Sequence, residues 1–396
     1  MGIKSSVHDR IYHADILSVK VGSQTVEMPS FVMPGLAEET VIVTLGYGRT
    51  KAGYIGNDVG VDSYKILPDL KRRLAEGVLL KRTGKTESLA TTQEQFAMNA
   101  DVIQEINVLS LDKRNPARIR TAEEFGAGMK IKQHKLPQMT KPWPYTGNKW
   151  GMVIDLTTCI GCNACVTACQ SENNIPVVGK DQVMRSRVMH WIRVDRYFTG
   201  DVKNPLSIAQ PVPCMHCENA PCEPVCPVSA TVHDKEGLNT MIYNRCIGTR
   251  YCGNNCPYKV RRFNYLDYTH SGDVYVDPVN KERNVLLQMQ KNPNVTVRYR
   301  GVMEKCTYCT QRIQEAKIAA TREQKDSDDL PDGAVTPACA QTCPTGAITF
   351  GNLNDDQSRV SVLKKTDRNY DLLDELNNRP RTSYLAKLRN PNQELV

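Results

Sequence analysis

Apolar and polar residues alternate in short segments of the second half of the chain, and two of these segments are related. Residues 152–156 (MVIDL) and 239–243 (NTMIY) alternate as strands do, and each leads into a Cys-Ile-Gly sequence. The stretches WGMVIDLTTCIGCNACVTACQSEN and GLNTMIYNRCIGTRYCGNNCPY are two copies of one unit. That unit is a short strand, a cysteine loop and a brief helix, so the pattern predicts an α+β fold with a tandem ferredoxin-like domain and four cluster-binding loops.

The segment MHWIRVDRYF (189–198) has the alternation of a buried strand. We therefore interpret His190 and Trp191 as residues of the core.

The first 145 residues contain no cysteine and are typical of a small mixed α/β domain. Residues 39–66 predict a short β-rich run followed by a glycine-rich loop. The glycine spacing matches neither the dinucleotide-binding pattern nor a P-loop. Residues 136–150 are rich in proline and aromatic residues and predict a linker, so we expect domains at 1–145 and 146–352.

Two further segments stand outside the repeat. The insertion 269–300 carries strand-like runs at 273–276 and 294–299, which predict a hairpin reaching a neighbour. Residues 353–396 are polar and charged and predict a C-terminal tail that wraps a partner or a surface.

The composition is that of a globular chain of 396 residues, with 40% hydrophobic and 24% charged residues. No stretch approaches the roughly 18 apolar residues that a membrane span needs. The start of the chain has no apolar signal region and no twin arginine, so we expect any export signal to lie elsewhere. The net charge of +8 is interpreted as a solvated basic surface, without the basic and aromatic run of a single-strand nucleic-acid binder.

Fifteen cysteines carry the chemistry. Their number is odd, the chain is long, and cysteines three residues apart are poorly placed to pair, so a disulfide framework is excluded. They fall into four groups: Cys159, Cys162, Cys165, Cys169; Cys214, Cys217, Cys222, Cys226; Cys246, Cys252, Cys256; and Cys306, Cys309, Cys339, Cys343.

The spacing of the first group, and the proline after the last cysteine of the other three, are those of bacterial ferredoxins. Three thiolates on one tight loop reach three corners of a cubane, and the fourth cysteine completes the other cluster of a pair. Gly161 and Gly248 let the loop turn so that backbone N–H groups face the cluster. Zinc is the alternative metal, but zinc sites rarely place four thiolates so close together repeatedly. The chain has no CxxCH sequence, so no c-type haem attaches to it.

Other candidate residues received simpler interpretations. His216 lies between two cysteines and is expected to form hydrogen bonds near a cluster or to fill space, since the cysteines needed as ligands are present. Three roles are open for the basic run of Lys259, Arg261 and Arg262: it could offset cluster charge, contact lipid head groups or simply be solvated. We expect the last. No Ser/His/Asp or paired-carboxylate arrangement supports catalysis by this chain, so no catalytic residue is expected.

Residues 150–350 resemble the four-cluster ferredoxin subunits of the complex iron–sulfur molybdoenzyme and polysulfide-reductase-like families. The motifs that carry the resemblance are CIGCNACVTAC, PVPCMHCENAPCEPVCPVSA, NRCIGTRYCGNNCPYKVRRFNY and EKCTYCTQRI with PACAQTCPTGAITFG. The large iron–sulfur subunit of bacterial alternative complex III is a closer match. Residues 41–64, the sequence LATTQ at 89–93 and the segment 169–198 look like parts of that subunit, in which a molybdopterin-like domain without cofactor precedes the clusters. Residues 1–145 would be the C-terminal part of that domain, most of which is missing, so either the gene is split or the chain is a fragment.

The resemblance implies which cysteines share a cluster. One centre takes Cys159, Cys162, Cys165 and Cys343; its neighbour takes Cys306, Cys309, Cys339 and Cys169; a third takes Cys214, Cys217, Cys222 and Cys256; and the last takes Cys246, Cys252 and Cys226. In the last set Thr249 stands where a fourth cysteine is expected. A hydroxyl is a poor iron ligand beside a thiolate, so we expect three [4Fe–4S] clusters and one [3Fe–4S] cluster, with no molybdopterin and no haem on this chain. The alternative is that Thr249 or a water molecule retains the fourth iron.

The implied function is electron transfer in a membrane-bound quinol oxidoreductase. Its partners would be an integral membrane quinone-binding subunit of the polysulfide-reductase type, a multihaem c-type cytochrome subunit and other subunits of the complex, on the periplasmic face of the inner membrane. Electrons would pass from quinol to the haem subunits and then to a cytochrome c or similar acceptor. The alternative is the iron–sulfur subunit of a polysulfide, nitrite or molybdenum-type reductase. A nucleic-acid-binding function fails on the cysteine spacing.

Overall fold

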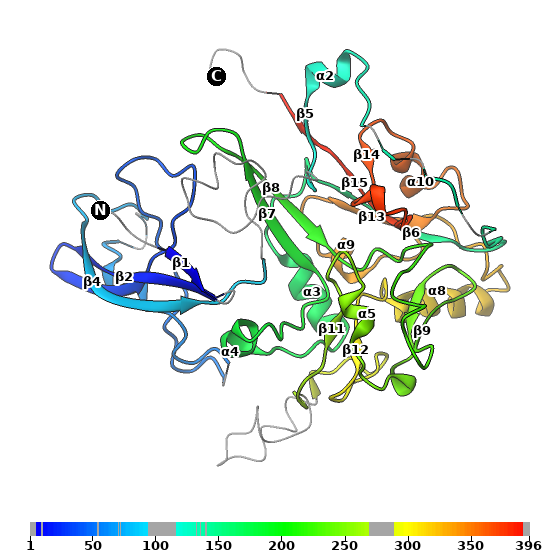
Figure 1. Ribbon diagram of the computed structural model, residues 1–396, viewed down its shortest axis with the longest axis horizontal. Coiled ribbons are helices and arrows are strands. Elements are labelled where there is room, and N and C mark those ends of the chain that lie inside the picture. Colours follow the sequence, from blue (N-terminus) through cyan, green and yellow to red (C-terminus); the bar gives the residue numbers. More distant parts are fainter. Residues whose placement is uncertain are drawn as a thin grey trace. The chain divides into compact units, whose positions relative to one another are not determined.

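The computed structural model describes residues 5–8, 11–53, 55–69, 71, 73–93, 116–131, 133–134, 136–138, 141–268 and 289–390. The chain forms two compact units (Figure 1). The first comprises residues 1–113, 177–188 and 197–207, and the second comprises the remainder. Helices and strands occur in both, so the predicted α+β class is confirmed.

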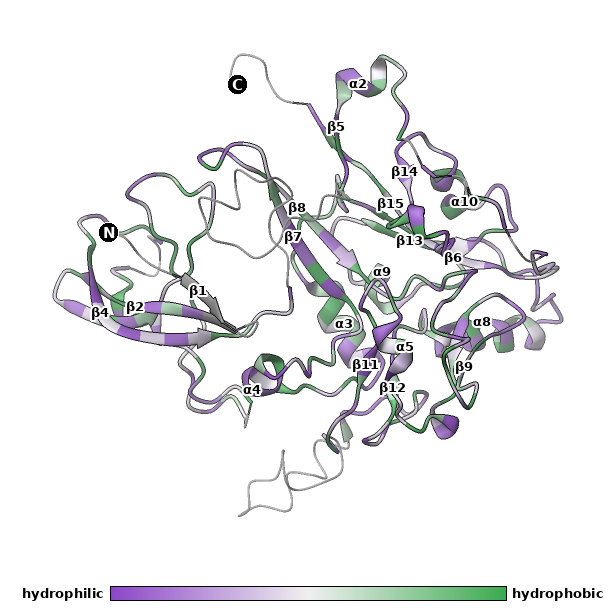
Figure 2. Ribbon diagram, viewed as in Figure 1, coloured by the Kyte–Doolittle hydropathy of each residue, from purple (hydrophilic) through white to green (hydrophobic). Residues whose placement is uncertain are grey.

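The first unit is built on an antiparallel sheet. Strand β2 (Ile11–Val21) pairs with β1 (Ser5–His8), β3 (Gln24–Pro29) and β4 (Leu79–Leu89). A cluster of Leu17, Val19, Val26 and Ile66 fills one face, and Ile66 comes from the 3₁₀ turn η1 (Ser63–Ile66). Strand β4 is largely hydrophilic, as suits an edge strand (Figure 2). The short helix α4 (Gly179–Met184) also belongs to this unit.

The prediction of a β-rich run within residues 39–66 is wrong. The described residues of this segment form turns and loops, and their only regular element is η1. Val41 and Ile42 are 46% and 65% exposed. Apolar residues without a burying partner strand do not form a sheet, whatever their propensity.

The core of the second unit is a mixed sheet around β6 (Trp150–Asp155), with strand order β13-β6-β15-β14. Strand β13 (Ile348–Asn352) runs antiparallel to β6, β15 (Thr382–Leu385) runs parallel to it, and β14 (Asn369–Tyr370) closes the edge. The predicted strand at residues 152–156 is therefore confirmed. It is buried along almost its whole length, as expected of a central strand.

The segment expected to be a polar tail is instead part of this core. Helix α10 (Arg359–Lys364) places Val360 against Val153 and Leu385. The tail prediction is wrong because β15 pairs with a strand more than two hundred residues earlier in the sequence, which local composition does not reveal.

Short elements surround the cysteine loops. They are α3 (Ala164–Glu172), β9 (Thr231–His233), β10 (Asn239–Met241), η2 (Tyr243–Arg245), α5 (Tyr251–Asn254), β11 (Arg262–Phe263), β12 (Met303–Glu304), α8 (Thr310–Arg322) and α9 (Ala338–Gln341). The strand expected at 239–243 is confirmed for its first three residues. Elsewhere, β5 (Ile119–Thr121) pairs with β16 (Lys387–Arg389), with α2 (Ala122–Gly126) following β5 and η3 (Asp374–Leu376) preceding β15.

Two other predicted strands have different outcomes. Strand β7 (Arg193–Thr199) pairs with β8 (Leu206–Val212), which confirms the strand in 189–198 from its fifth residue onward. Trp191 is buried, as expected. The strand predicted at 294–299 is wrong. These residues form turns and irregular backbone, and Arg298 forms an ion pair with Glu304. The run 273–276 lies outside the described residues.

Candidate iron–sulfur sites

The first set of cysteines lines a single cavity. Cys159 and Cys162 come from the loop between β6 and α3, Cys165 comes from the first turn of α3, and Cys343 comes from the loop before β13. Burial and then the neighbouring thiols raise the pKa of Cys165 to about 11. Four thiols that oppose each other's ionisation are stable as thiolates only around shared positive charge. This donor set therefore fits a metal cluster.

A second cavity is lined by Cys214, Cys217, Cys222 and Cys256. Burial, followed by the three other thiols, raises the pKa of Cys217 well above its usual value. Cys256 belongs to the next cysteine group along the chain, so the structure brings a cysteine from one group to three of another. This is the crossed arrangement that the ferredoxin spacing predicts.

The set of Cys169, Cys306, Cys309 and Cys339 is also brought together. Cys169 is buried at the α3 side of this site. Burial and then the other three thiols raise its pKa well above the usual range. The side-chain amide of Asn173 lies 3.6 Å from Cys169 Sγ and 3.8 Å from Cys309 Sγ. Asn173 was not singled out from the sequence, although it lies one helical turn after Cys169.

The last set lies on neighbouring loops. Cys226 precedes β9, and Cys246 and Cys252 follow β10. The two loops are joined by Arg245, which donates to the carbonyl of Ser229 (2.9 Å). Thr249 is exposed between Cys246 and Cys252.

The two related loops share one backbone conformation, which places Thr249 where Cys162 stands. Gly161 and Gly248 have φ of 68° and 75°, and the residues just before α3 and α5, Asn163 and Arg250, have φ of 62° and 64°. A Cβ on Gly248 would lie 2.5 Å from the carbonyl oxygen of Gly301, so this position requires glycine. The exchange of cysteine for threonine thus leaves the loop intact and removes only a thiolate.

The prolines after the crossing cysteines mark a second repeated geometry. The N–H of Ala230 donates to Cys226 Sγ (3.2 Å), and the N–H of Ala347 donates to Cys343 Sγ (3.3 Å). Burial acts to raise the pKa of both thiols, but backbone N–H groups at Cys226, and the Thr345 hydroxyl together with backbone N–H groups at Cys343, hold it below the usual value. Backbone donors of this kind stabilise a negatively charged sulfur.

The sites follow one another in a series. Cys165 contributes to the raised pKa of Cys339, and Cys214 contributes to that of Cys306, so the thiols of these pairs lie within electrostatic reach of each other. Arg261 lies near both Cys222 and Cys252. The order is therefore the Cys159 set, the Cys169 set, the Cys214 set and the Cys226 set.

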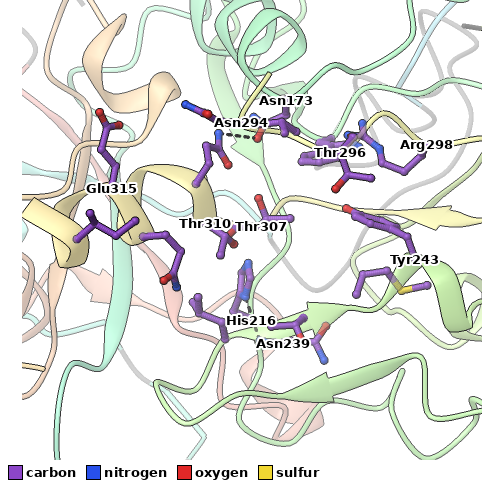
Figure 3. Close-up of a pocket in the computed structure, with 18 of the residues that line it drawn as sticks. Asn173, His216, Asn239, Tyr243, Asn294, Thr296, Arg298, Thr307, Thr310 and Glu315 are labelled. Atoms are coloured by element: carbon purple, nitrogen blue, oxygen red, sulfur yellow. Dashed lines mark hydrogen bonds between the residues drawn. The ribbon is translucent and has the colours of Figure 1, made fainter. Parts of the chain in front are cut away.

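His216 lies beside Asn239 (Figure 3) and contacts both middle sites, since it stands between Cys214 and Cys217 in the chain and its ring reaches the carbonyl of Cys306. Its ring is buried and packs on Tyr308 with centroids 3.9 Å apart. The N–H of Asn239 donates to Nδ1 (3.2 Å), so Nε2 carries the proton and donates to the carbonyl of Cys306 (3.1 Å). Burial, then Lys305 and Arg381, hold its pKa well below 6.5. His216 therefore bonds near the clusters, as expected, and remains neutral.

The expectation that the basic run is solvated is wrong for Arg261. Lys259 is exposed, but Arg261 is only 7% exposed and its Nη1 lies 3.1 Å from Cys222 Sγ. Offsetting cluster charge was one of the three roles considered for the basic run. Nothing in the local sequence, however, distinguishes Arg261 from Lys259.

All fifteen thiols are free of disulfide bonds. In the described part of the chain, no helix is both long and apolar enough to cross a bilayer.

Comparisons with known proteins agree with this geometry. Residues 158–230 and 207–271 each match a family described as 4Fe-4S dicluster domain. The chain is 40% identical over 241 residues to the iron-sulfur cluster-binding subunit of menaquinone reductase from Nitratidesulfovibrio vulgaris, covering 60% of this chain and 89% of the relative. It is 34% identical to an iron-sulfur subunit assigned to a dimethyl sulfoxide reductase from Halobacterium salinarum, covering 60% and 78%. It is 31% identical to Hdr-like menaquinol oxidoreductase iron-sulfur subunit 1 from Archaeoglobus fulgidus, covering 54% and 75%.

The family matches span residues 158–271, which hold the first three cysteine groups, and confirm the predicted ferredoxin-like character. Together with the cysteine sites, they place the chain in the family of 4Fe-4S dicluster iron–sulfur subunits of the menaquinone reductase and complex iron–sulfur molybdoenzyme type.

Proposed function

We propose that this chain is the electron-transfer subunit of a membrane-bound quinol oxidoreductase of the alternative complex III type. The supporting observation is the series of four cysteine sets, each close to the next. Bound clusters supply one-electron transfer over a wide range of potentials. The chain's own part is to hold them in sequence and to shield them with buried side chains.

Within this proposal the clusters are three [4Fe–4S] and one [3Fe–4S]. The first three sets offer four thiols each, and the Cys226 set offers three. Support for the three-iron cluster comes from the loop backbone around Thr249, whose positive φ angles match those of the Cys162 loop although threonine replaces the cysteine.

The proposed partners are a quinone-binding membrane subunit of the polysulfide-reductase type and a multihaem c-type cytochrome subunit, on the periplasmic face. Residues 1–145 would be the C-terminal part of a molybdopterin-like domain and its linker. The separate sheet unit before the first cysteine site is consistent with an added domain. Two relatives whose names include menaquinone or menaquinol favour a quinone-linked complex.

A second candidate is the iron–sulfur subunit of a reductase. Its support is the similarity to a dimethyl sulfoxide reductase subunit and, at 30% identity over 215 residues, to one of the chains of polysulfide reductase from Wolinella succinogenes.

Purification of the intact complex through a tag on this chain separates the two. Multihaem cytochromes, with no molybdenum, would support the quinol oxidoreductase. A co-purifying subunit with bound molybdenum and reductase activity would support the alternative. A preparation free of iron and acid-labile sulfide would contradict both.

A further inference from the structure

Among the described residues, the four least exposed lysine and arginine residues fall into two pairs. Arg298 forms an ion pair with Glu304 (2.9 Å), and Arg381 forms one with Glu218 (2.5 Å). Arg261 and Lys305, which are 7% and 0% exposed, have no carboxylate within ion-pairing distance in the described part of the chain. An unpaired buried charge is costly, so these two cations require another negative partner.

Both cations touch the cysteine sites instead. Arg261 Nη1 lies 3.1 Å from Cys222 Sγ and 3.3 Å from Asn239 Oδ1, and Nη2 lies 3.2 Å from Met241 Sδ. Lys305 Nζ donates to the carbonyl oxygen of Cys306 (2.9 Å). One cation thus lies between the Cys214 and Cys226 sets, and the other lies between the Cys169 and Cys214 sets.

The carboxylate linked to Arg261 through the hydrogen-bond network is already neutralised. Glu223 accepts from the amide of Asn239 (2.5 Å) and forms an ion pair with His233 (2.8 Å). Glu223 raises the pKa of His233 against the effect of burial, which favours the charged pair. The charge on Arg261 is therefore available to the cysteine site.

Both cations lie near Cys222. Arg261 Nη1 lies 3.1 Å from its sulfur, and Lys305 also acts electrostatically on this thiol. A site that stabilises a thiolate in this way also stabilises additional negative charge on whatever that thiolate binds.

We propose that Arg261 and Lys305 are fixed counter-charges that raise the reduction potential of the cluster held by Cys214, Cys217, Cys222 and Cys256. Reduction adds one electron to a centre that is already anionic because of its four thiolates. Two buried cations at that centre favour the reduced state, and the low local dielectric leaves their effect largely unscreened. The inference rests on the cluster assignment of the proposed function and adds an energetic role for two residues that are not ligands.

The test is a redox titration of the purified complex followed by EPR, in wild type and in variants of this chain. The signal of the third cluster is assigned by its change in Cys217→Ser. Arg261→Gln and Lys305→Met each remove one charge, Arg261→Lys retains it, and Lys259→Gln removes an exposed charge from the same basic run. In Lys305→Met the Cys306 carbonyl keeps the His216 donor.

We expect Arg261→Gln and Lys305→Met to lower the ratio of reduced to oxidised cluster at fixed potential about tenfold, which is 59 mV for a one-electron couple. Arg261→Lys should restore most of that shift, and Lys259→Gln should change the ratio less than about twofold because water screens its charge. Unchanged potentials in Arg261→Gln and Lys305→Met at full iron content would overturn the inference and leave the proposed function intact. If the complex with Arg261→Gln does not assemble, the reduction potential measured in Lys305→Met tests the inference. A wild-type complex without iron or sulfide would instead contradict the proposed function itself.

Discussion

Arg298 and Glu304 form an ion pair of 2.9 Å in which both side chains are almost fully buried. The carboxylate also accepts from Trp191 Nε1 (3.1 Å) and Asn264 Nδ2 (3.0 Å), and the guanidinium lies 4.9 Å from the centre of the Trp191 ring. This network joins the irregular segment before β12 to β12 itself and to the residues before β7. It holds together the region that carries Cys306, two residues after Glu304.

Arg298→Met should destabilise the protein strongly. It leaves the Glu304 carboxylate buried without its cation, which costs about 3–5 kcal/mol. Chemical denaturation of the cluster-loaded chain measures this. Asp181→Asn, which breaks the exposed pair with Arg185, is the control and should have little effect. Equal stability of Arg298→Met and wild type would show that the pair is not important for the fold.

Some of these features could be predicted from the sequence, and others could not. The cysteine loops and the strand at β6 are encoded locally, by the cysteine spacing and by the strand-like alternation of residues 152–156. Strand β15 is not, because its position depends on parallel pairing with β6. Arg261 and Lys259 are chemically similar and two residues apart, yet one is buried and one is exposed. Only the tertiary structure around Cys222 distinguishes them.

Thr249→Cys should convert the proposed three-iron cluster to a four-iron cluster. The loop already has the backbone of its cysteine-containing counterpart, so the new thiol can occupy the place that Cys162 takes in the first loop. EPR of the oxidised protein should lose its three-iron signal, and iron content should rise by one per chain. Thr249→Ser is the control and should retain the signal. A wild-type protein without a three-iron signal would contradict the proposal.

Cys256→Ser tests whether ligands cross between groups. Cys256 shares a cavity with Cys214, Cys217 and Cys222, so its loss should change the same EPR signal that Cys217→Ser changes. Cys252→Ser, from the same sequence group as Cys256, should change the three-iron signal instead. If Cys256→Ser and Cys252→Ser altered one signal in common, each group would bind its own cluster and the crossed arrangement would be wrong.

Lys364 should make stability depend on pH in the alkaline range. Its Nζ donates to Ser383 Oγ (2.8 Å), and burial lowers its pKa to about 8, with partial compensation from Asp371. In the unfolded chain a lysine has a pKa of about 10.4. Between these values the unfolded state binds a proton that the folded state has lost, so the free energy of unfolding contributed by this group rises with pH. Below pH 8 the folded protein carries the full cost of the buried charge.

Thermal unfolding of wild type and Lys364→Met across pH 7 to 10 measures this effect. As pH rises through 8, the midpoint of wild type should increase relative to that of the variant, because the cost of the buried ammonium disappears only in wild type. Lys365→Met is the control, because it changes the adjacent exposed lysine, which pairs with Asp356 at the surface and does not contact the core. Parallel curves for wild type and Lys364→Met would mean that the Lys364 ammonium is solvated in the folded protein, and α10 would then pack less closely on the core sheet than its contacts with Ser383 indicate.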